Sequence, residues 1–334
     1  MRRVVRSLRR GMGGKLIQGF FAGASKLGQL HPDAKPEKHG VEVLRDVPYA
    51  SGGALAEHRL DVYRPIDLDG PAPAVLYIHG GAFHILSKDT HWVMGLAFAS
   101  RGYVVFNVSY RLAPQHPFPA AVEDVARAYE WLVAHAAEYG GDLDRLVIAG
   151  ESAGANLTTS LTLSTVYPRP EPFARAVFDT GVVPRAAIPA CGVFQVTDME
   201  RYARRKPRFP AFLSDRFREM QHAYLGATPE AHGETLDLVD VVRWLERGER
   251  PARPLPPFFL PVGTKDPLLD DTRRLDRALR ALGGVSEARY YPGQIHAFHA
   301  FVFLESARRC WRDQFDFLER HVGHRPVVAR SATA

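Results

Sequence analysis

Residues 146–154 of the chain are Leu146-Val147-Ile148-Ala149-Gly150-Glu151-Ser152-Ala153-Gly154. The first four residues form a short apolar run, which is typical of a buried strand, and residues 155–161 are compatible with a helix. Between them lies a G-x-S-x-G motif, whose two glycines allow the backbone to turn sharply from strand to helix. A turn of this kind holds the serine side chain on an exposed, strained elbow. We therefore predict that Ser152 is a nucleophile and that its base and orienting acid lie elsewhere in the chain.

A glycine-rich loop, His79-Gly80-Gly81-Ala82-Phe83, directly follows a second apolar run at residues 74–78. Acyl transfer needs backbone N–H groups that point at the developing oxyanion, and glycines let such a loop approach the substrate closely. We predict that the amides of Gly80, Gly81 and Ala153 form an oxyanion hole. We expect a structural role for His79, because the base follows the nucleophile along the chain in folds that carry this elbow.

The predicted acid follows the apolar run at residues 258–262. Asp266 lies just beyond the C-terminal end of that predicted strand, where its carboxylate can orient a histidine. Asp270 and Asp271 are the nearby alternatives. We expect both to begin the next helix, where acidic side chains match the helix dipole.

The predicted base is His296, on a loop that follows the last predicted strand. His299 is the alternative, and we expect it at the start of the final helix. The order Ser152, Asp266, His296 is the nucleophile–acid–histidine order of one known type of catalytic triad. Each of the three residues follows a predicted strand.

Strands and helices alternate along most of the chain. The predicted strands are residues 41–49, 58–63, 74–78, 103–108, 146–149, 187–194, 258–262 and 288–291, and the predicted helices include 90–100, 120–137, 273–282 and 301–321. This alternation favours an α/β fold with a doubly wound, mostly parallel sheet. In such sheets ligands bind beyond the C-terminal ends of the strands, and the motifs above lie at those ends.

We divide the chain into four parts. They are an N-terminal basic arm with a lid helix (1–40), a catalytic domain (41–198 and 258–323), a lid insertion (199–257) and a disordered tail (324–334). The insertion is rich in Arg and Pro and contains two helix-like stretches, 214–225 and 236–247. Its basic run is expected to be a solvated lid surface, with docking to a membrane or an acidic substrate as the alternative; it comprises Arg201, Arg204, Arg205, Lys206 and Arg208.

The net positive charge of the chain comes from residues 1–30. The formal net charge is +6, but residues 1–30 hold seven Lys and Arg and no acid, which leaves 36 Lys and Arg against 37 Asp and Glu elsewhere. The high isoelectric point therefore does not indicate a nucleic-acid-binding core, and we expect no nucleic-acid partner.

The arm has apolar residues at helical spacing, with arginines beside the apolar stripe. Three interpretations remain open: a lid helix over the active site, a basic amphipathic helix through which residues 1–30 contact an anionic membrane, and a secretory signal. No stretch approaches 18 consecutive apolar residues, so we expect no membrane-spanning helix. The default expectation is a cytoplasmic protein, with peripheral membrane association and a homodimer left open.

The chain has two cysteines, Cys191 and Cys310, far apart in the sequence. We expect both to be reduced and buried rather than to form a disulfide framework or a zinc site. The chemistry inferred above needs neither a metal ion nor a cofactor.

These motifs together resemble the hormone-sensitive-lipase-like family of α/β-hydrolase esterases, which includes bacterial carboxylesterases and arylacetamide-deacetylase-type enzymes. The resemblance covers about residues 41–322 and rests on residues 79–83, 110–114, 117–121, 150–154, 266–268 and 291–296. It implies that Ser152, Asp266 and His296 form the triad, and that the segment 110–121 braces the oxyanion loop. Two positions depart from the family pattern. Ala82 stands where glycine is usual, so that a positive φ would be costly there, and Glu151 stands where Asp is frequent.

The sequence therefore predicts a serine carboxylic ester hydrolase that acts through an acyl-enzyme. The resemblance implies short- to medium-chain esters as substrates. The alternatives are a membrane-surface lipase, an amide or lactone hydrolase, and a ligand receptor that keeps the hydrolase fold without turnover.

Overall fold

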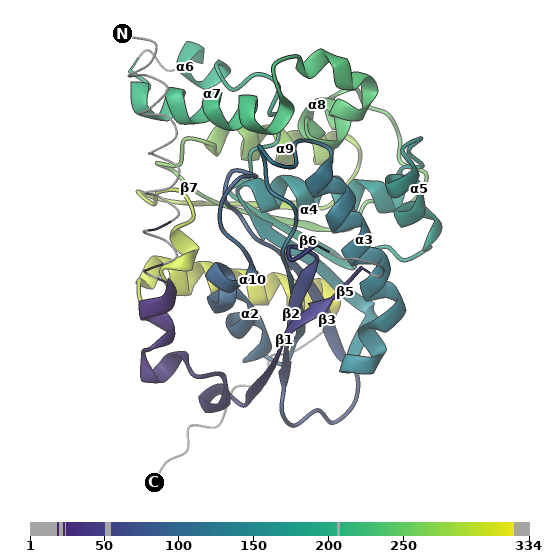
Figure 1. Ribbon diagram of the computed structural model, residues 1–334, viewed down its shortest axis with the longest axis vertical. Coiled ribbons are helices and arrows are strands. Elements are labelled where there is room, and N and C mark those ends of the chain that lie inside the picture. The colour runs from purple at the N-terminus through teal and green to yellow at the C-terminus, as the bar shows by residue number, and fades with distance from the viewer. Residues whose placement is uncertain (1–18, 20–22, 24, 51–54, 206–207, 324–334) are drawn as a thin grey trace.

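The computed structural model describes residues 19, 23, 25–50, 55–205 and 208–323. The predictions for the first part of the basic arm and for the tail at 324–334 lie outside these residues. Residues 31–40, the last part of the arm, contain two short 3-10 turns, η1 (Pro32–Ala34) and η2 (Pro36–His39). The chain then enters the first strand of the sheet (Figure 1).

The described residues contain one eight-stranded sheet with the order β1-β2-β4-β3-β5-β6-β7-β8. Strand β2 is antiparallel to both of its neighbours, whereas the pairs from β4 to β8 are parallel. The predicted α/β class with a mostly parallel sheet is therefore confirmed. The strands are β1 (Val41–Pro48), β2 (Arg59–Pro65), β3 (Ala72–Ile78), β4 (Val104–Val108), β5 (Gly141–Glu151), β6 (Ala186–Ala190), β7 (Phe258–Gly263) and β8 (Ser286–Tyr291).

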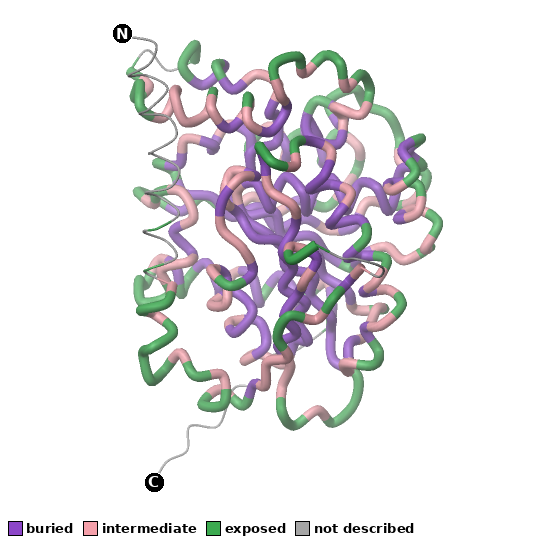
Figure 2. Tube along the Cα trace, in the orientation of Figure 1, coloured by how far each residue is buried: buried purple, intermediate pink, exposed green. Residues whose placement is uncertain are grey.

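Both faces of the sheet are covered, which explains why the central strands β3 and β6 are apolar and buried at every position. Successive side chains of a strand point to opposite faces, so Leu76 and Ile78 of β3 join one hydrophobic cluster while Val75 and Tyr77 join another. Figure 2 shows these buried strands at the centre of the molecule and the exposed residues at its periphery.

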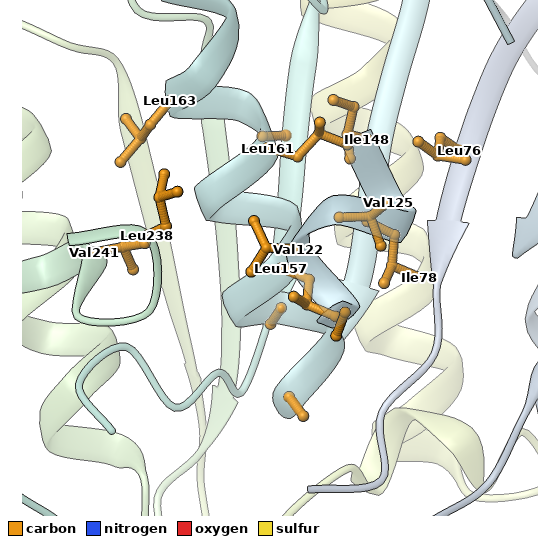
Figure 3. Packing of buried hydrophobic residues seen from close by; sticks show 14 of the residues in the cluster. Leu76, Ile78, Val122, Val125, Ile148, Leu157, Leu161, Leu163, Leu238 and Val241 are labelled. Atoms are coloured by element: carbon orange, nitrogen blue, oxygen red, sulfur yellow. The ribbon is translucent and has the colours of Figure 1, made fainter. Parts of the chain in front are cut away.

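Different helices cover the two faces. The first cluster contains residues of α3 (Ala120–His135) and α4 (Ala153–Val166), and the second contains residues of α2 (Trp92–Ala99) and α10 (Glu305–Val322). Figure 3 shows side chains of α3 and α4, among them Val125 and Leu161, packed beside Ile148 of β5. Fully burying a side chain of this size stabilises the fold by about 1.5–3 kcal/mol. Helix α4, which begins directly after Ser152, is thereby held firmly on the sheet.

Two further helices complete the layers, α5 (Pro172–Asp179) and α9 (Leu269–Ala281). The sequence analysis did not predict α5, a short helix that begins at a proline and buries only Ala174 and Val177. It also placed the start of α10 too early, because residues 301–304, which follow the short 3-10 turn η6 (Phe298–Ala300), form a turn rather than helix.

The segment between β6 and β7 contains α6 (Arg201–Arg205), α7 (Ala211–Leu225), the 3-10 segment η5 (Pro229–Leu238) and α8 (Val241–Glu246). Within the predicted basic run, Arg204, Arg205 and Arg208 are exposed. The prediction was wrong for Arg201, which is 3% exposed and forms a 2.5 Å ion pair with the buried carboxylate of Asp271. Lys206 lies outside the described residues.

This helical segment contacts the loops at the C-terminal edge of the sheet. The ring of Tyr224 in α7 stacks on Phe83 in the loop after β3, and its carbonyl accepts a hydrogen bond from the amide of Phe118 in the loop after β4. A groove also lies between residues 208–213 and the loop after β7. Figure 1 shows α6 and α7 side by side at one end of the molecule. None of the helices among the described residues is both long enough and apolar enough to cross a membrane.

Candidate active site

Ser152 lies at the junction of β5 and α4. Its backbone has φ 55° and ψ −116°, a conformation that costs a residue with a side chain about 1–3 kcal/mol. The N–H of Ser152 donates to the carbonyl of Ala190 at the end of β6 (2.9 Å). Gly150 and Gly154 have no room for a side chain, because a Cβ at either position would lie 2.5 Å or 2.1 Å from the carbonyl oxygen of Ile78. The elbow is therefore pressed against the end of β3 and needs both glycines.

Three side chains from separate loops form one hydrogen-bonded chain. Nε2 of His296 lies 2.9 Å from Oγ of Ser152, and Nδ1 of the same ring lies 2.8 Å from Oδ2 of Asp266. In this arrangement the serine hydroxyl donates to Nε2 and the Nδ1–H donates to the carboxylate. The Asp266 side chain is fully buried, whereas that of His296 is 34% exposed. The structure thus brings together the three residues that the sequence singled out as nucleophile, acid and base.

The loop after β7 fixes the orientation of Asp266. Its second carboxylate oxygen, Oδ1, accepts a hydrogen bond from the amide of Leu268 (2.8 Å). The two alternative acids lie in the first turn of α9, as predicted. Asp270 pairs with Arg273, and Asp271 accepts hydrogen bonds from Arg201 and from the amide of Phe194. Neither alternative is hydrogen-bonded to His296.

The carboxylate of Asp266 controls the protonation of His296. Burial alone disfavours the charged ring, but the adjacent negative charge outweighs burial and raises the pKa of His296 well above its ordinary value. An imidazole in this setting is a stronger base and forms a more stable imidazolium. The site can therefore accept a proton from Ser152 and hold it on a ring of fixed orientation.

The loop after β3 presents the predicted oxyanion-hole amides. Gly81 has φ 122°, and a Cβ there would lie 2.0 Å from the carbonyl oxygen of Ile85. Among the hydrogen bonds between described residues, none uses the N–H of Gly80, Gly81 or Ala153 as a donor. These three amides are therefore free to bind an acceptor.

Ala82 adopts a positive φ, 52°, and Phe83 follows with φ 63°. The expected cost at Ala82 is thus present, at about 1–2 kcal/mol for a residue with a Cβ. The loop is held in this shape by two hydrogen bonds, from the amides of His84 and Ile85 to the carbonyl of Gly81 (3.0 Å each). Pairing of the Ala113 amide with the Phe83 carbonyl (2.9 Å) anchors its far end. The segment around Ala113 therefore braces the loop, as the family resemblance implies.

His79 is buried beside the loop and is not hydrogen-bonded to Ser152. Its Nδ1 lies 2.7 Å from the carbonyl oxygen of Gly80, and its ring stacks on Tyr110 with centroids 4.2 Å apart. Burial lowers the pKa of His79 to about 3, so the ring is neutral. The hydroxyl of Tyr110 donates to the carbonyl of His79 (2.9 Å). These contacts agree with the structural role predicted for His79.

A second polar cluster, which the sequence analysis missed, lies behind the elbow. The side chain of Glu151 is buried, with Oε1 2.8 Å from Nε2 of His91 and Oε2 3.1 Å from Nε2 of His299. Although burial alone would raise it, the two histidines lower the pKa of Glu151 below its ordinary range. His299 is therefore in η6 and bound to an acid, rather than at the start of the final helix. The one signal in the sequence is the acid next to Ser152, which must find a partner if it is buried.

Cys191 lies directly after β6, against the triad. Both cysteines are free and buried, as predicted, and burial raises the pKa of the Cys191 thiol. Within the described part of the chain, only Cys191, Asp266 and His296 form a group of three potential metal ligands, with ligand atoms within 4.8 Å of one another. Two of these residues already bind each other in the hydrogen-bonded chain to Ser152, so that chain accounts for the group without a metal.

A groove of about 660 Å³ lies next to the acid loop. It is lined by Arg205, Arg208, Phe209, Pro210, Leu213, Thr264, Lys265, Asp266 and Pro267. Asp266 is among its lining residues, whereas Ser152 and His296 are not, so the groove lies beside the acid of the triad.

Comparisons with known proteins agree with this fold and with this arrangement of motifs. A family model described as the alpha/beta hydrolase fold matches residues 75–300, which include the elbow, the glycine-rich loop and all three members of the hydrogen-bonded chain. Esterase LipQ of Mycobacterium tuberculosis is 29% identical over 82% of this chain, and the match spans 61% of that relative's own length. Carboxylesterase NlhH of the same organism is 29% identical over 84% of this chain and 80% of the relative.

A solved structure of an esterase from Pyrobaculum calidifontis superimposes with a TM-score of 0.72. The two chains are 25% identical, and the superposition covers 95% of this chain and 97% of the other. The similarity therefore extends over the sheet, its helices and the segment between β6 and β7.

Proposed function

The chain belongs to the α/β-hydrolase fold family, in its hormone-sensitive-lipase-like branch, and from this premise we propose that it is a serine carboxylic ester hydrolase acting on short- to medium-chain esters. The observation that carries the proposal is the chain of hydrogen bonds from Ser152 through His296 to Asp266. The names of the relatives LipQ and NlhH, an esterase and a carboxylesterase, support the same reaction.

In the first half of the proposed reaction, Ser152 Oγ attacks the ester carbonyl carbon while Nε2 of His296 takes the hydroxyl proton. The carbonyl π-electrons move to oxygen, and the amides of Gly80, Gly81 and Ala153 donate to that oxyanion. Asp266 stabilises the imidazolium and keeps Nε2 pointed at Ser152. When the tetrahedral intermediate collapses, His296 gives its proton to the leaving alcohol, and the acyl group stays on Ser152.

In the second half, a water molecule takes the place of the alcohol. Nε2 of His296 removes a proton from the water as it attacks the acyl-enzyme, and the same three amides hold the second oxyanion. Collapse releases the carboxylic acid and returns the proton to Ser152. Each step uses side chains and amides of this chain, and none needs a metal ion or a cofactor.

The decisive experiment is hydrolysis of p-nitrophenyl esters from acetate to palmitate, with Ser152→Ala as the control. Turnover that is greatest for short chains and absent in the variant would support the proposal. Greatest turnover for long chains would favour a lipase, and amide or lactone substrates should be tried if no ester is cleaved. Undiminished turnover in Ser152→Ala would overturn the assignment of the nucleophile.

The division of the chain also remains a proposal. We infer that residues 199–257 form a lid insertion over the catalytic domain, since Tyr224 in this segment stacks on Phe83 of the glycine-rich loop. A cytoplasmic location, a homodimer and a membrane contact through residues 1–30 are predictions of the sequence alone. Binding to anionic vesicles of the intact chain, but not of a chain that lacks residues 1–30, would support the membrane contact.

A further inference from the structure

The carboxylate of Glu151 lies where three elements of the site meet. Glu151 is the last residue of β5 and precedes Ser152, yet its side chain points into the protein and is buried. A Cβ added to Gly80 would lie 3.2 Å from both Cγ and Oε1 of this side chain, so the carboxylate also abuts the glycine-rich loop. A buried carboxylate is stable only when it is paired. His91 and His299 lie next to this carboxylate, and their positions are therefore fixed relative to Ser152.

His299 connects this carboxylate to the loop that carries His296. Its Nε2 contacts Oε2 of Glu151 at 3.1 Å, although not with the geometry of a hydrogen bond, and its carbonyl accepts a hydrogen bond from Nε1 of Trp311 in α10 (3.0 Å). The side chain of His299 is 7% exposed. His299 is thus held from both sides, by the strand that ends at the nucleophile and by the last helix.

The residues that precede His296 in the same loop are hydrogen-bonded to the loop that carries Asp266. The amide of Lys265 donates to the carbonyl of Gln294 (2.9 Å), and the amide of Gly293 donates to Oγ1 of Thr264 (2.8 Å). His296 therefore lies between two attachments, one to the loop of Asp266 and one to the strand of Ser152. Between the attachments, Ala297 adopts a positive φ of 54°, which costs energy and is maintained by the groups on either side.

We propose that Glu151 and His299 are a pair of positioning residues that hold Nε2 of His296 within hydrogen-bonding distance of Ser152. His91 binds the first oxygen of the carboxylate and so turns the second oxygen toward His299. Loss of the pair releases one attachment of the histidine loop, while Asp266 and the glycine-rich loop remain in place. Because a displacement of about 1 Å in a catalytic group can cost about 100-fold in rate, the pair acts on kcat rather than on substrate binding.

The test compares two substitutions of His299. His299→Phe keeps a ring of similar size but removes the nitrogen that contacts the Glu151 carboxylate, and it should lower kcat about 10- to 100-fold with KM nearly unchanged. His299→Gln keeps an amide N–H near the position of Nε2 and should restore kcat to within about threefold of the wild type. The matched control is His135→Phe, in α3, where the ring stacks on Trp131 and the change should leave kcat as it is.

The reaction of each variant with a p-nitrophenyl alkylphosphonate distinguishes a displaced His296 from a loss of correctly folded protein. The final yield of p-nitrophenol counts competent sites, and the rate constant reports how well His296 activates Ser152. A slower reaction with an unchanged number of sites supports the proposal. Wild-type kcat in His299→Phe, or a loss confined to the number of sites, overturns it. If His299→Phe does not fold, Glu151→Gln carries the same test with the same two outcomes.

This inference rests on the proposed esterase function, and the same probe separates the two. A wild-type chain that does not react with the phosphonate contradicts the function. A wild-type chain that reacts, together with a His299→Phe variant that reacts equally fast, contradicts only the positioning pair.

Discussion

The ring of Tyr224 lies on the ring of Phe83 with centroids 3.9 Å apart and planes inclined by 2°. Phe83 closes the glycine-rich loop after β3, and Tyr224 lies near the end of α7, between β6 and β7. A contact between two buried rings thus connects the proposed lid to the proposed oxyanion hole. The strained backbone at Ala82 and Phe83 depends on such packing for its shape.

The first prediction concerns this contact. Tyr224→Ala should lower the free energy of unfolding by about 3–5 kcal/mol, because it removes a large buried ring. It should also lower kcat about tenfold through a looser oxyanion loop. Urea denaturation and p-nitrophenyl acetate kinetics measure the two effects.

Tyr224→Phe provides the control, because it keeps the ring and removes only the hydroxyl. That hydroxyl is buried and has no hydrogen-bond partner among the described residues. An unsatisfied buried group gains nothing from folding, so its removal should leave stability equal or slightly higher. A loss of stability in Tyr224→Phe as large as that in Tyr224→Ala would contradict the importance of the stacked rings.

The second prediction concerns the acid and the pH profile. kcat/KM for a neutral ester should fall as the pH drops through the pKa of His296, because the imidazolium cannot accept the proton of Ser152. Asp266 raises that pKa, so Asp266→Asn should move the acid limb to lower pH. The variant should also lose about 10⁴-fold in kcat, since the amide favours the wrong tautomer of the ring.

Asp270→Asn is the matched change at a neighbouring carboxylate, whose one ion pair within the described part of the chain is with Arg273 at the protein surface. We expect the pH profile of kcat/KM and the kcat of Asp270→Asn to equal those of the wild type. If Asp270→Asn lost activity and Asp266→Asn did not, the acid would be misassigned.

The third prediction concerns Asp271, whose carboxylate is buried and bonded to Arg201 and to the amide of Phe194. Asp271→Asn leaves the arginine buried without its counter-charge, which should cost about 3–5 kcal/mol of stability. The chemistry should be retained, so kcat per site counted by phosphonate titration should stay within a few-fold of the wild type. A loss of kcat per site as large as that of Asp266→Asn would instead place Asp271 among the catalytic residues.

The positions of the three site residues could be predicted from the sequence because each follows a predicted strand. In a parallel sheet the C-terminal ends of the strands lie on one edge, so Ser152, Asp266 and His296 were expected to meet there. The order of the three along the chain then separated His296 from His79. The structure adds the distances and the elbow conformation, which depend on how the strands pack rather than on any local pattern.

Residues whose roles depend on distant partners could not be predicted in this way. Arg201 belongs to a basic run that is typical of an exposed surface, and only the fold brings it to Asp271. Glu151 and His299 are far apart in the sequence, and neither has a local pattern that indicates the other. Burial of a charge is decided by tertiary partners, so the sequence analysis could assign neither residue.

The last prediction uses the strain at the nucleophile. Ser152 has φ 55° and ψ −116°, a region that glycine occupies as readily as its mirror image but that a Cβ makes costly. Ser152→Ala and Ser152→Gly both remove the hydroxyl, and both should be inactive. They differ in the Cβ, so Ser152→Gly should be the more stable of the two by about 1 kcal/mol, which is the relief of strain less the added flexibility of the unfolded chain. Thermal and urea unfolding of the two variants measure that difference directly. Equal stability, or a more stable alanine variant, would mean that the elbow is not strained, and the catalytic serine would then be held at no cost to the fold.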